Sequence, residues 1–249
     1  MSTLQRLLEL DGPTLNSQIS YLLGSSTKIE KTWNKLEVGT LVMYLSPHVE
    51  SGWNLCPWAS EGCAAACLKG SGRMRFTRAR LARVRRTILF MKHRSLFKIR
   101  LRREIRAHTR KCARLGIVCS VRLNGTSDIA WEKVWPGLFS EFANVQFYDY
   151  TKSVARAKLS VEPEWPANYH LTFSRSEETA DSTVLNVVGE DVNVAVVFEN
   201  ELPDEWIGIE VIDGDAHDYR PEDKQGVIVG LTEKRTPGTV DHTGFVVRA

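Results

Sequence analysis

Short runs of strand-forming residues, separated by helical segments and polar turns, constrain the fold of this chain most. Six runs rich in Val, Ile, Tyr and Phe follow Gly116, at residues 117–123, 145–150, 169–173, 192–198, 209–212 and 227–231. A seventh run, 40–45, comes before them. Several are apolar on both faces, as buried parallel strands are, and helical turns at 135–142 and 154–159 separate the early ones. The pattern predicts an α/β fold, a partial parallel (β/α) barrel over residues 39–231.

The length of 249 residues, with 43% hydrophobic and 25% charged residues, fits one domain with a large core. We expect residues 1–38 to form an N-terminal extension and residues 232–249 a C-terminal tail. Residues 1–17 lack the apolar stretch of a signal peptide, and no run approaches eighteen consecutive apolar residues. The sequence therefore predicts a cytoplasmic protein with no membrane segment.

Residues 74–115 form a long arginine-rich helical segment, with apolar residues three and four positions apart and no Pro or Gly. Gly116 is expected to end it as a C-cap residue. The stretch 92–95 predicts a break into two helices. Residues 69–114 hold 18 of the 33 basic residues and a single acid, Glu104.

With so few acids in the segment, the usual pairing of opposite charges along a helix is not available, and the basic side chains repel one another. Two kinds of anion could compensate it: a nucleic acid bound along the helices, or the acidic remainder of the same chain. We expect Arg83, Arg86 and Arg94 to be exposed in the first case.

Three of the five cysteines, Cys56, Cys63 and Cys67, lie within twelve residues of one another. Cys63 and Cys67 are four apart, so a helical turn would point both sulfurs the same way. Three thiolates are an incomplete zinc shell, but they suit an iron–sulfur cluster with one open iron. Buried thiols or a disulfide are the alternatives, and the odd cysteine count disfavours a disulfide framework. Cys112 and Cys119 are expected to be core thiols.

Polar residues follow the carboxyl end of each predicted strand. These stretches are Asn124 to Asp128, Asp149 to Lys152, Ser174 to Glu178 and Asp213 to Asp218. Each one alone is ordinary turn chemistry. In parallel barrels, however, active sites are built from the loops at this edge, so the four stretches predict a shared site with the cysteine loop.

Five ordered motifs resemble those of the gene product 88-like proteins of bacteriophages. They are residues 51–59 with Cys63 and Cys67, then 122–129, 148–152, 169–174 and 211–215. The resemblance runs over residues 41–231. It implies a phage-encoded protein in the cytoplasm of a host cell, and by itself it implies no activity.

The chain also resembles, more distantly, the radical S-adenosylmethionine enzymes, which have a partial parallel barrel and a three-cysteine loop after the first strand. The spacing differs, because six and three residues separate these cysteines where the usual motif has three and two. Ala66 also stands where that motif has an aromatic residue.

This second resemblance implies a 4Fe-4S cluster held by Cys56, Cys63 and Cys67, with S-adenosylmethionine as a small-molecule cofactor and an electron donor from the host. The residues it implies around the cofactor stand at the strand ends: Asn124, Thr126, Ser127, Asp128, Tyr148, Tyr150, Lys152, Ser174, Glu177, Asp213 and Asp215. The substrate stays open, with a nucleotide or nucleic acid favoured by the basic helices. His170 is expected to pack within its strand.

Two other functions stay open. One is a zinc-stabilised nucleic-acid-binding protein, in which His93, His170 or Cys112 supplies a fourth ligand. The other is a metal-independent phosphoryl or glycosyl transferase that uses Asp213, Asp215 and Asp218.

Overall fold

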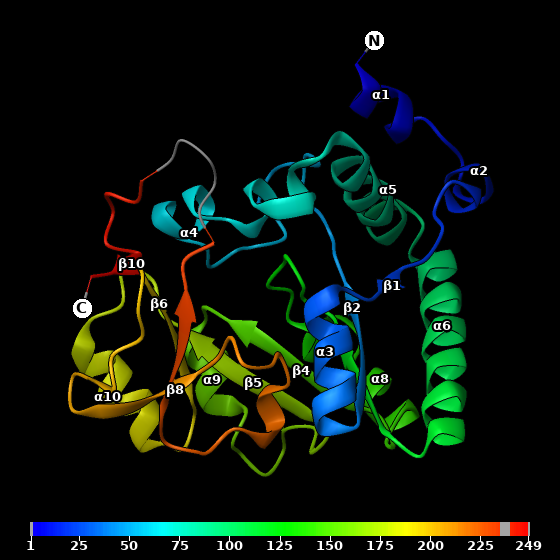
Figure 1. Ribbon diagram of the computed structural model, residues 1–249. Coiled ribbons are helices and arrows are strands. Elements are labelled where there is room, and N and C mark those ends of the chain that lie inside the picture. The colour runs from blue at the N-terminus through cyan, green and yellow to red at the C-terminus, as the bar shows by residue number, and fades with distance from the viewer. Residues whose placement is uncertain (1, 235–239, 249) are drawn as a thin grey trace.

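The computed structural model describes residues 2–234 and 240–248, which form a mixed α/β structure around a ten-stranded, mostly parallel sheet (Figure 1). The strands are β1 (Leu23–Gly24), β2 (Val38–Met43), β3 (Val118–Arg122), β4 (Gln146–Thr151), β5 (Tyr169–Ser174), β6 (Val194–Phe198), β7 (Glu205–Trp206), β8 (Ile209–Asp213), β9 (Ile228–Thr232) and β10 (Val246–Val247). Their order in the sheet is β1-β2-β3-β4-β5-β6-β9-β8-β7, and β10 pairs with β6. All seven predicted strands are present, within two residues of the expected bounds at either end.

The strands from β2 through β8 in the sheet order are parallel, so their carboxyl ends share one edge. The two-residue strands β1 and β7 lie at the ends of the sheet and pair in antiparallel fashion. Between these end strands the described sheet is open, and closure into a partial barrel is not confirmed. The predicted α/β class is confirmed at this coarser level.

Helices pack on the sheet and around its edge. They are α1 (Thr3–Leu8), α2 (Gly12–Ser17), α3 (Thr27–Leu36), α4 (Glu61–Ala65), α5 (Thr77–Lys92), α6 (Arg94–Leu115), α7 (Trp131–Val134), α8 (Gly137–Glu141), α9 (Val154–Leu159) and α10 (Asp181–Gly189), with 3-10 turns at Leu68–Gly70, Gly72–Arg75 and Arg220–Glu222. The predicted break near residues 92–95 is confirmed, because α5 and α6 meet at His93. Gly116 ends α6 with a positive φ of 67°, a conformation that favours glycine.

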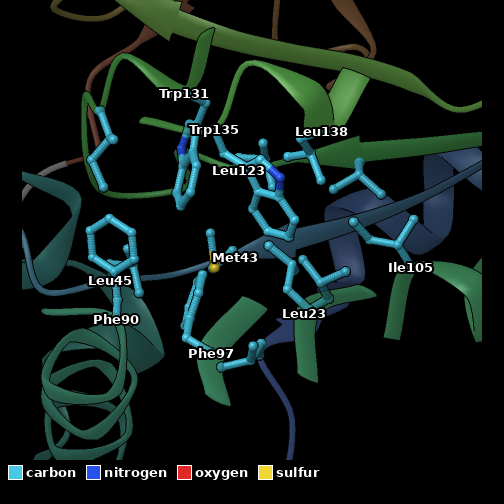
Figure 2. Close-up of a cluster of buried hydrophobic side chains, with 14 of the residues drawn as sticks. Leu23, Met43, Leu45, Phe90, Phe97, Ile105, Leu123, Trp131, Trp135 and Leu138 are labelled. Carbon is cyan, nitrogen blue, oxygen red and sulfur yellow. The ribbon is translucent and has the colours of Figure 1, made fainter. Parts of the chain in front are cut away.

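The largest hydrophobic core lies between α5, α6 and the β2–β3 side of the sheet. Figure 2 shows Phe97 pointing toward Met43, with Trp131 on the opposite side of that methionine. The rings of Phe90 and Phe97 meet edge to face at 5.1 Å, and Phe97 stacks on Trp131 at 6.3 Å. Phe97 and Trp131 are fully buried, so these aromatic contacts fix the two basic helices against the sheet.

Several arginines of these helices point inward. Arg83 and Arg86, expected to be exposed, are buried, and Arg86 donates to the carbonyls of Tyr21 and Tyr44 at 2.8 and 3.3 Å. Arg100 likewise donates from Nη2 to the Ile19 carbonyl at 2.6 Å. Guanidinium groups carry five donors, so they can satisfy main-chain carbonyls where a loop crosses a helix. The expected exposure, which went with nucleic-acid binding, was therefore wrong for Arg83 and Arg86, because the carbonyls that Arg86 contacts lie far away in sequence; Arg94 is half-buried.

The predicted extension and tail both contribute to the sheet. β1 of the extension pairs with β2, and the main-chain N–H groups of Leu22 and Leu23 donate to the carboxylate of Glu104. The sole acid of the basic segment therefore anchors the start of β1. In the tail, β10 pairs in parallel with β6.

Candidate functional site

The three loop cysteines follow β2, the first of the parallel strands. Cys56 lies in the loop itself, Cys63 lies in α4, and Cys67 comes directly after that helix. Figure 1 shows α4 above the upper edge of the sheet, near β10 and β6. The Ser60 hydroxyl accepts from the Cys63 N–H at 3.2 Å and so begins α4. The Asn54 side chain accepts from the Cys56 N–H at 2.9 Å.

The three thiols are half-buried and influence one another electrostatically. The pKa of Cys56 is raised to about 11, chiefly by burial; the hydrogen bond from the His48 N–H opposes this effect, and the neighbouring Cys67 and Cys63 add to it. Burial also raises the pKa of Cys63, with Cys67 adding to the effect and Lys152 opposing it. This mutual influence places all three sulfurs in one region. A metal that bound there would have to displace thiol protons.

The spacing of these sulfurs bears on which metal they fit. Among residues 2–234 and 240–248, the group with three ligand atoms within 4.8 Å of one another is His108, Cys112 and Cys119, and the loop cysteines form no such group. Zinc bonds of about 2.3 Å to sulfur require sulfurs no more than about 4.6 Å apart. At least one pair of the loop sulfurs is therefore more than 4.8 Å apart, so these side chains would have to move to share one zinc ion.

Glu177 joins the cysteine helix to the end of β5. Its carboxylate accepts from the Ser60 hydroxyl at 2.7 Å and from the Gly62 N–H at 2.6 Å. Burial acts to raise the pKa of Glu177, but these hydrogen bonds outweigh it and lower the pKa overall. A Cβ at Gly62 would lie 2.7 Å from Glu177 Oε2, so the contact requires glycine.

Lys152 extends from the end of β4 toward Cys63. Its ammonium donates to the Ser174 carbonyl and hydroxyl at 3.3 and 3.1 Å and to the Arg175 carbonyl at 3.0 Å. Burial lowers the pKa of Lys152, while the nearby Cys63, Asp128 and Glu177 act in the opposite direction. A cation thus lies near Cys63, where it favours the thiolate form of that side chain.

The C-terminal segment completes this side of the site. The ring of Phe245 lies under the Lys152 ammonium at 4.7 Å, and Arg175 donates to the Gly244 carbonyl at 2.9 Å. Thr243 approaches Gly62 so closely that a Cβ there would collide with its hydroxyl.

Asp128 links the cysteine loop to β4. Its N–H donates to the Leu55 carbonyl at 2.9 Å, next to Cys56. Its carboxylate accepts from the Lys152 N–H at 2.8 Å and from Arg156 at 2.7 Å. Burial raises the pKa of Asp128, and the hydrogen bond from Lys152 and the charge of Arg156 oppose that effect. Arg156, which sequence reasoning missed, also pairs with Glu132 at 2.9 Å.

The other predicted residues after β3 organise their own loop. Asn124 accepts from the Ser127 hydroxyl at 2.9 Å and from Trp131 Nε1 at 3.1 Å, while its amide donates to Asp149 at 3.3 Å. Thr126 donates to the Leu45 carbonyl, and its own carbonyl lies 3.6 Å from Cys56 Sγ. These side chains thus hold the loop that carries Asp128 against Cys56.

Tyr148 and Tyr150 lie on one face of β4 beside buried charges. The Tyr148 hydroxyl donates to Asp218 at 3.3 Å, and Arg122 pairs with the same carboxylate at 3.1 Å while lying 4.7 Å over the Tyr150 ring. Arg220, also missed, is 1% exposed and pairs with Asp223 at 3.1 Å. The one sequence signal for this cluster was a charged residue, Arg122, at the end of an apolar strand.

On the neighbouring strand β5, His170 packs beside this cluster as expected. Burial, assisted by the charge of Arg220, lowers its pKa to about 4, so the imidazole is neutral at physiological pH.

Asp213 and Asp215 hold the turn after β8. Asp213 Oδ1 accepts from the Asp215 N–H at 2.8 Å, and Asp215 accepts from the Thr232 N–H at 2.8 Å and from Lys234 at 3.1 Å. The structure thus brings Asp128, Lys152, Ser174 and Glu177 together around the cysteines. It gives Asp213 and Asp215 contacts with β9 and the chain just after it.

None of the helices in the described ranges combines the length and apolar character needed to cross a membrane. No curated protein and no solved structure matches the chain. A family model described as gene product 88 matches residues 17–249, which is most of the sequence. The earlier resemblance is thereby confirmed at the level of family, and the chain belongs to the bacteriophage gene product 88 family.

Proposed function

We propose that this protein is an iron–sulfur enzyme of radical S-adenosylmethionine type. The observation that carries the proposal is the grouping of Cys56, Cys63 and Cys67 above the carboxyl edge of a parallel sheet, with Lys152 and Asp128 beside them. Binding sites in parallel α/β folds form at this edge. In this proposal the open sheet serves as a partial barrel, with the cysteine loop above its mouth.

Each cysteine would bind a different iron of a 4Fe-4S cluster, leaving the fourth iron for S-adenosylmethionine. Such a cluster, once reduced by a host electron donor, supplies the electron that cleaves this cofactor. Lys152 would hold positive charge beside Cys63, and the loop that carries Asp128 would fix Cys56. Trp53 precedes Cys56 and Trp58 follows it, and Trp58, which is 38% exposed, lies under the Arg156 guanidinium at 5.4 Å.

The cofactor would approach along the strand ends, where Ser174 and the Lys152 main chain lie. The Ser174 hydroxyl accepts a hydrogen bond from the Lys152 ammonium. A ligand that replaced this hydroxyl as the acceptor would be held by an N–H of the lysine. Asp128 already accepts hydrogen bonds from Arg156 and the Lys152 N–H. We therefore assign Asp128 to shaping the site, and Lys152 and Ser174 to contacting the cofactor.

A nucleic-acid substrate is favoured by one surface. Ile99, Arg102, Arg103, Arg106 and Arg110 line a hollow on the outer side of α6. Arg102 and Arg106 pair with Glu141 at 2.7 and 3.1 Å, and Arg103, Arg106 and Arg110 are all exposed. Four guanidinium groups on two helical turns suit a phosphate backbone. The same surface supports the second candidate, a nucleic-acid-binding protein without catalysis.

The test is anaerobic reconstitution with iron and sulfide, followed by reduction in the presence of S-adenosylmethionine. We expect a brown protein that releases methionine and 5'-deoxyadenosine. Separate Cys56→Ala, Cys63→Ala and Cys67→Ala variants should lose most of the iron, while the matched control Cys119→Ala should keep it. A fully loaded, reducible cluster that neither binds nor cleaves the cofactor would refute the radical mechanism.

A further inference from the structure

We propose that His108, Cys112 and Cys119 form a second metal site, a zinc site buried between α6 and the sheet. This inference does not depend on the proposed function. His108 and Cys112 are four residues apart on α6 and therefore share the face that packs on β3, which carries Cys119. All three side chains are buried. From the sequence we expected both cysteines to be core thiols, with Cys112 alternatively a fourth zinc ligand for the cysteine loop.

The ligand atoms are already close enough for one ion. One atom from each residue lies within 4.8 Å of the other two. Cys112 Sγ stands 3.8 Å from His108 Nδ1 and 3.7 Å from Nε2. Zinc bonds of about 2.0 Å to nitrogen and 2.3 Å to sulfur place tetrahedral ligands about 3.5 Å apart. The separations between Cys112 Sγ and the ring nitrogens are close to this spacing.

The imidazole is oriented as a metal ligand usually is. His108 Nε2 lies 2.8 Å from the Gly39 carbonyl and 3.2 Å from the Ser120 carbonyl, both of which can only accept. The proton of the neutral ring must therefore sit on Nε2, which leaves Nδ1 free to bind. Histidines that bind metals commonly donate their other N–H to a carbonyl in this way, and that bond fixes the tautomer.

The charges balance in the buried complex. Zn²⁺ would replace the thiol protons of Cys112 and Cys119, and the two protons would pass to water. Two thiolates and one neutral imidazole around a divalent ion carry no net charge, which is what a buried site requires. The three side chains supply three of the four positions of a tetrahedral site.

Gly39 provides the room for this arrangement. A Cβ at that position would lie 2.7 Å from Cys112 Sγ and 3.5 Å from His108 Cε1. Trp33 covers the far side of the imidazole with ring centres 6.0 Å apart, and Lys111 lies over Trp33 at 4.6 Å. The bound ion would fasten the basic helix α6 to β2 and β3.

The experiment uses the full chain with Cys56, Cys63 and Cys67 all changed to Ala, so that the loop binds nothing. After chelation and reduction, we expect this triple variant to bind one equivalent of Zn²⁺ and to melt at a higher temperature with zinc than without it. Co²⁺ in its place should give sulfur-to-cobalt charge-transfer bands typical of thiolate ligands. Adding Cys119→Ser, which keeps the volume of the side chain, should weaken zinc binding at least 10-fold.

Thr109→Val is the matched control, since Thr109 contacts Cys119 Sγ at 3.7 Å but offers no ligand to the ion. It should keep the zinc. Absence of zinc and of the cobalt bands in the triple variant would overturn the inference, as would unchanged affinity after Cys119→Ser. A mass two hydrogens lower than that of the reduced chain would identify a Cys112–Cys119 disulfide and also overturn it. None of these results bears on iron binding by the loop, so the two proposals fail separately.

Discussion

Removing the Glu177 carboxylate should loosen the cysteine helix without unfolding the sheet. This side chain accepts two short hydrogen bonds, from Ser60 and from the N–H of Gly62, both at the start of α4. Hydrogen bonds to a charged group contribute about 1.5–3 kcal/mol each. This edge of the molecule is partly open to solvent, so we expect Glu177→Ala to lower the free energy of local opening of α4 by about 2 kcal/mol in total. That loss corresponds to about a 30-fold change in the equilibrium for local opening.

Amide hydrogen exchange measures that opening directly. The N–H groups of Ala64 and Ala66 donate to the carbonyls of Ser60 and Gly62 within α4, and their exchange should accelerate about 30-fold in Glu177→Ala. Glu178→Ala is the matched control, because Glu178 is exposed and its exchange pattern should equal that of the parent. Equal protection of α4 in the two variants would refute the reasoning.

The pH dependence of the same contact has a definite sign. The folded-state pKa of Glu177 is lowered, so its contribution is present above the unfolded pKa and is lost as the pH falls through the folded value. Protection of Ala64 and Ala66 in the parent should therefore decline at acid pH. In Glu177→Ala it should show no such decline.

Three further predictions concern the rest of the molecule. The pKa of His170 falls from 6.5 to about 4 on folding, so the unfolded chain takes up a proton at a higher pH than the folded protein does, and stability should drop by about 2.5 kcal/mol between pH 6.5 and pH 4; denaturant unfolding of His170→Gln should lack this drop. Phe97→Ala should destabilise the fold by about 4 kcal/mol, measured the same way, and a loss under about 1 kcal/mol would contradict the packing between α6 and Trp131. Arg103→Ala and Arg110→Ala should each reduce the salt dependence of nucleic-acid binding by about one unit of slope. Nucleic-acid binding that does not change with salt concentration would show that this surface is not the binding site.

The strands and the two basic helices were predictable because their signals are local. Apolar runs of the right length predict buried strands, and the break at His93 followed from the polar stretch around it. The burial of Arg86 was not predictable, because its acceptors belong to Tyr21 and Tyr44, which are remote in sequence.

The candidate site likewise has features that the sequence predicts and features that it does not. The gathering of Lys152, Ser174 and Glu177 near the cysteines followed from one rule, that parallel strands end at the same edge. The bond between Asp128 and Arg156 depends on the angle at which α9 packs on the sheet, and no sequence spacing encodes that angle. The pairing of β10 with β6 rests on two residues and is too short to leave a periodic signal.

The position of the C-terminal segment sets an order of assembly. Thr243 and Phe245 lie against Gly62 and Lys152, so the wall beside Cys63 includes residues that the ribosome adds after every other contributor to the site. While the chain is being synthesised, the cysteine loop can fold on the sheet yet stays open on that side. That side closes only when β10 pairs with β6 and brings Phe245 against Lys152.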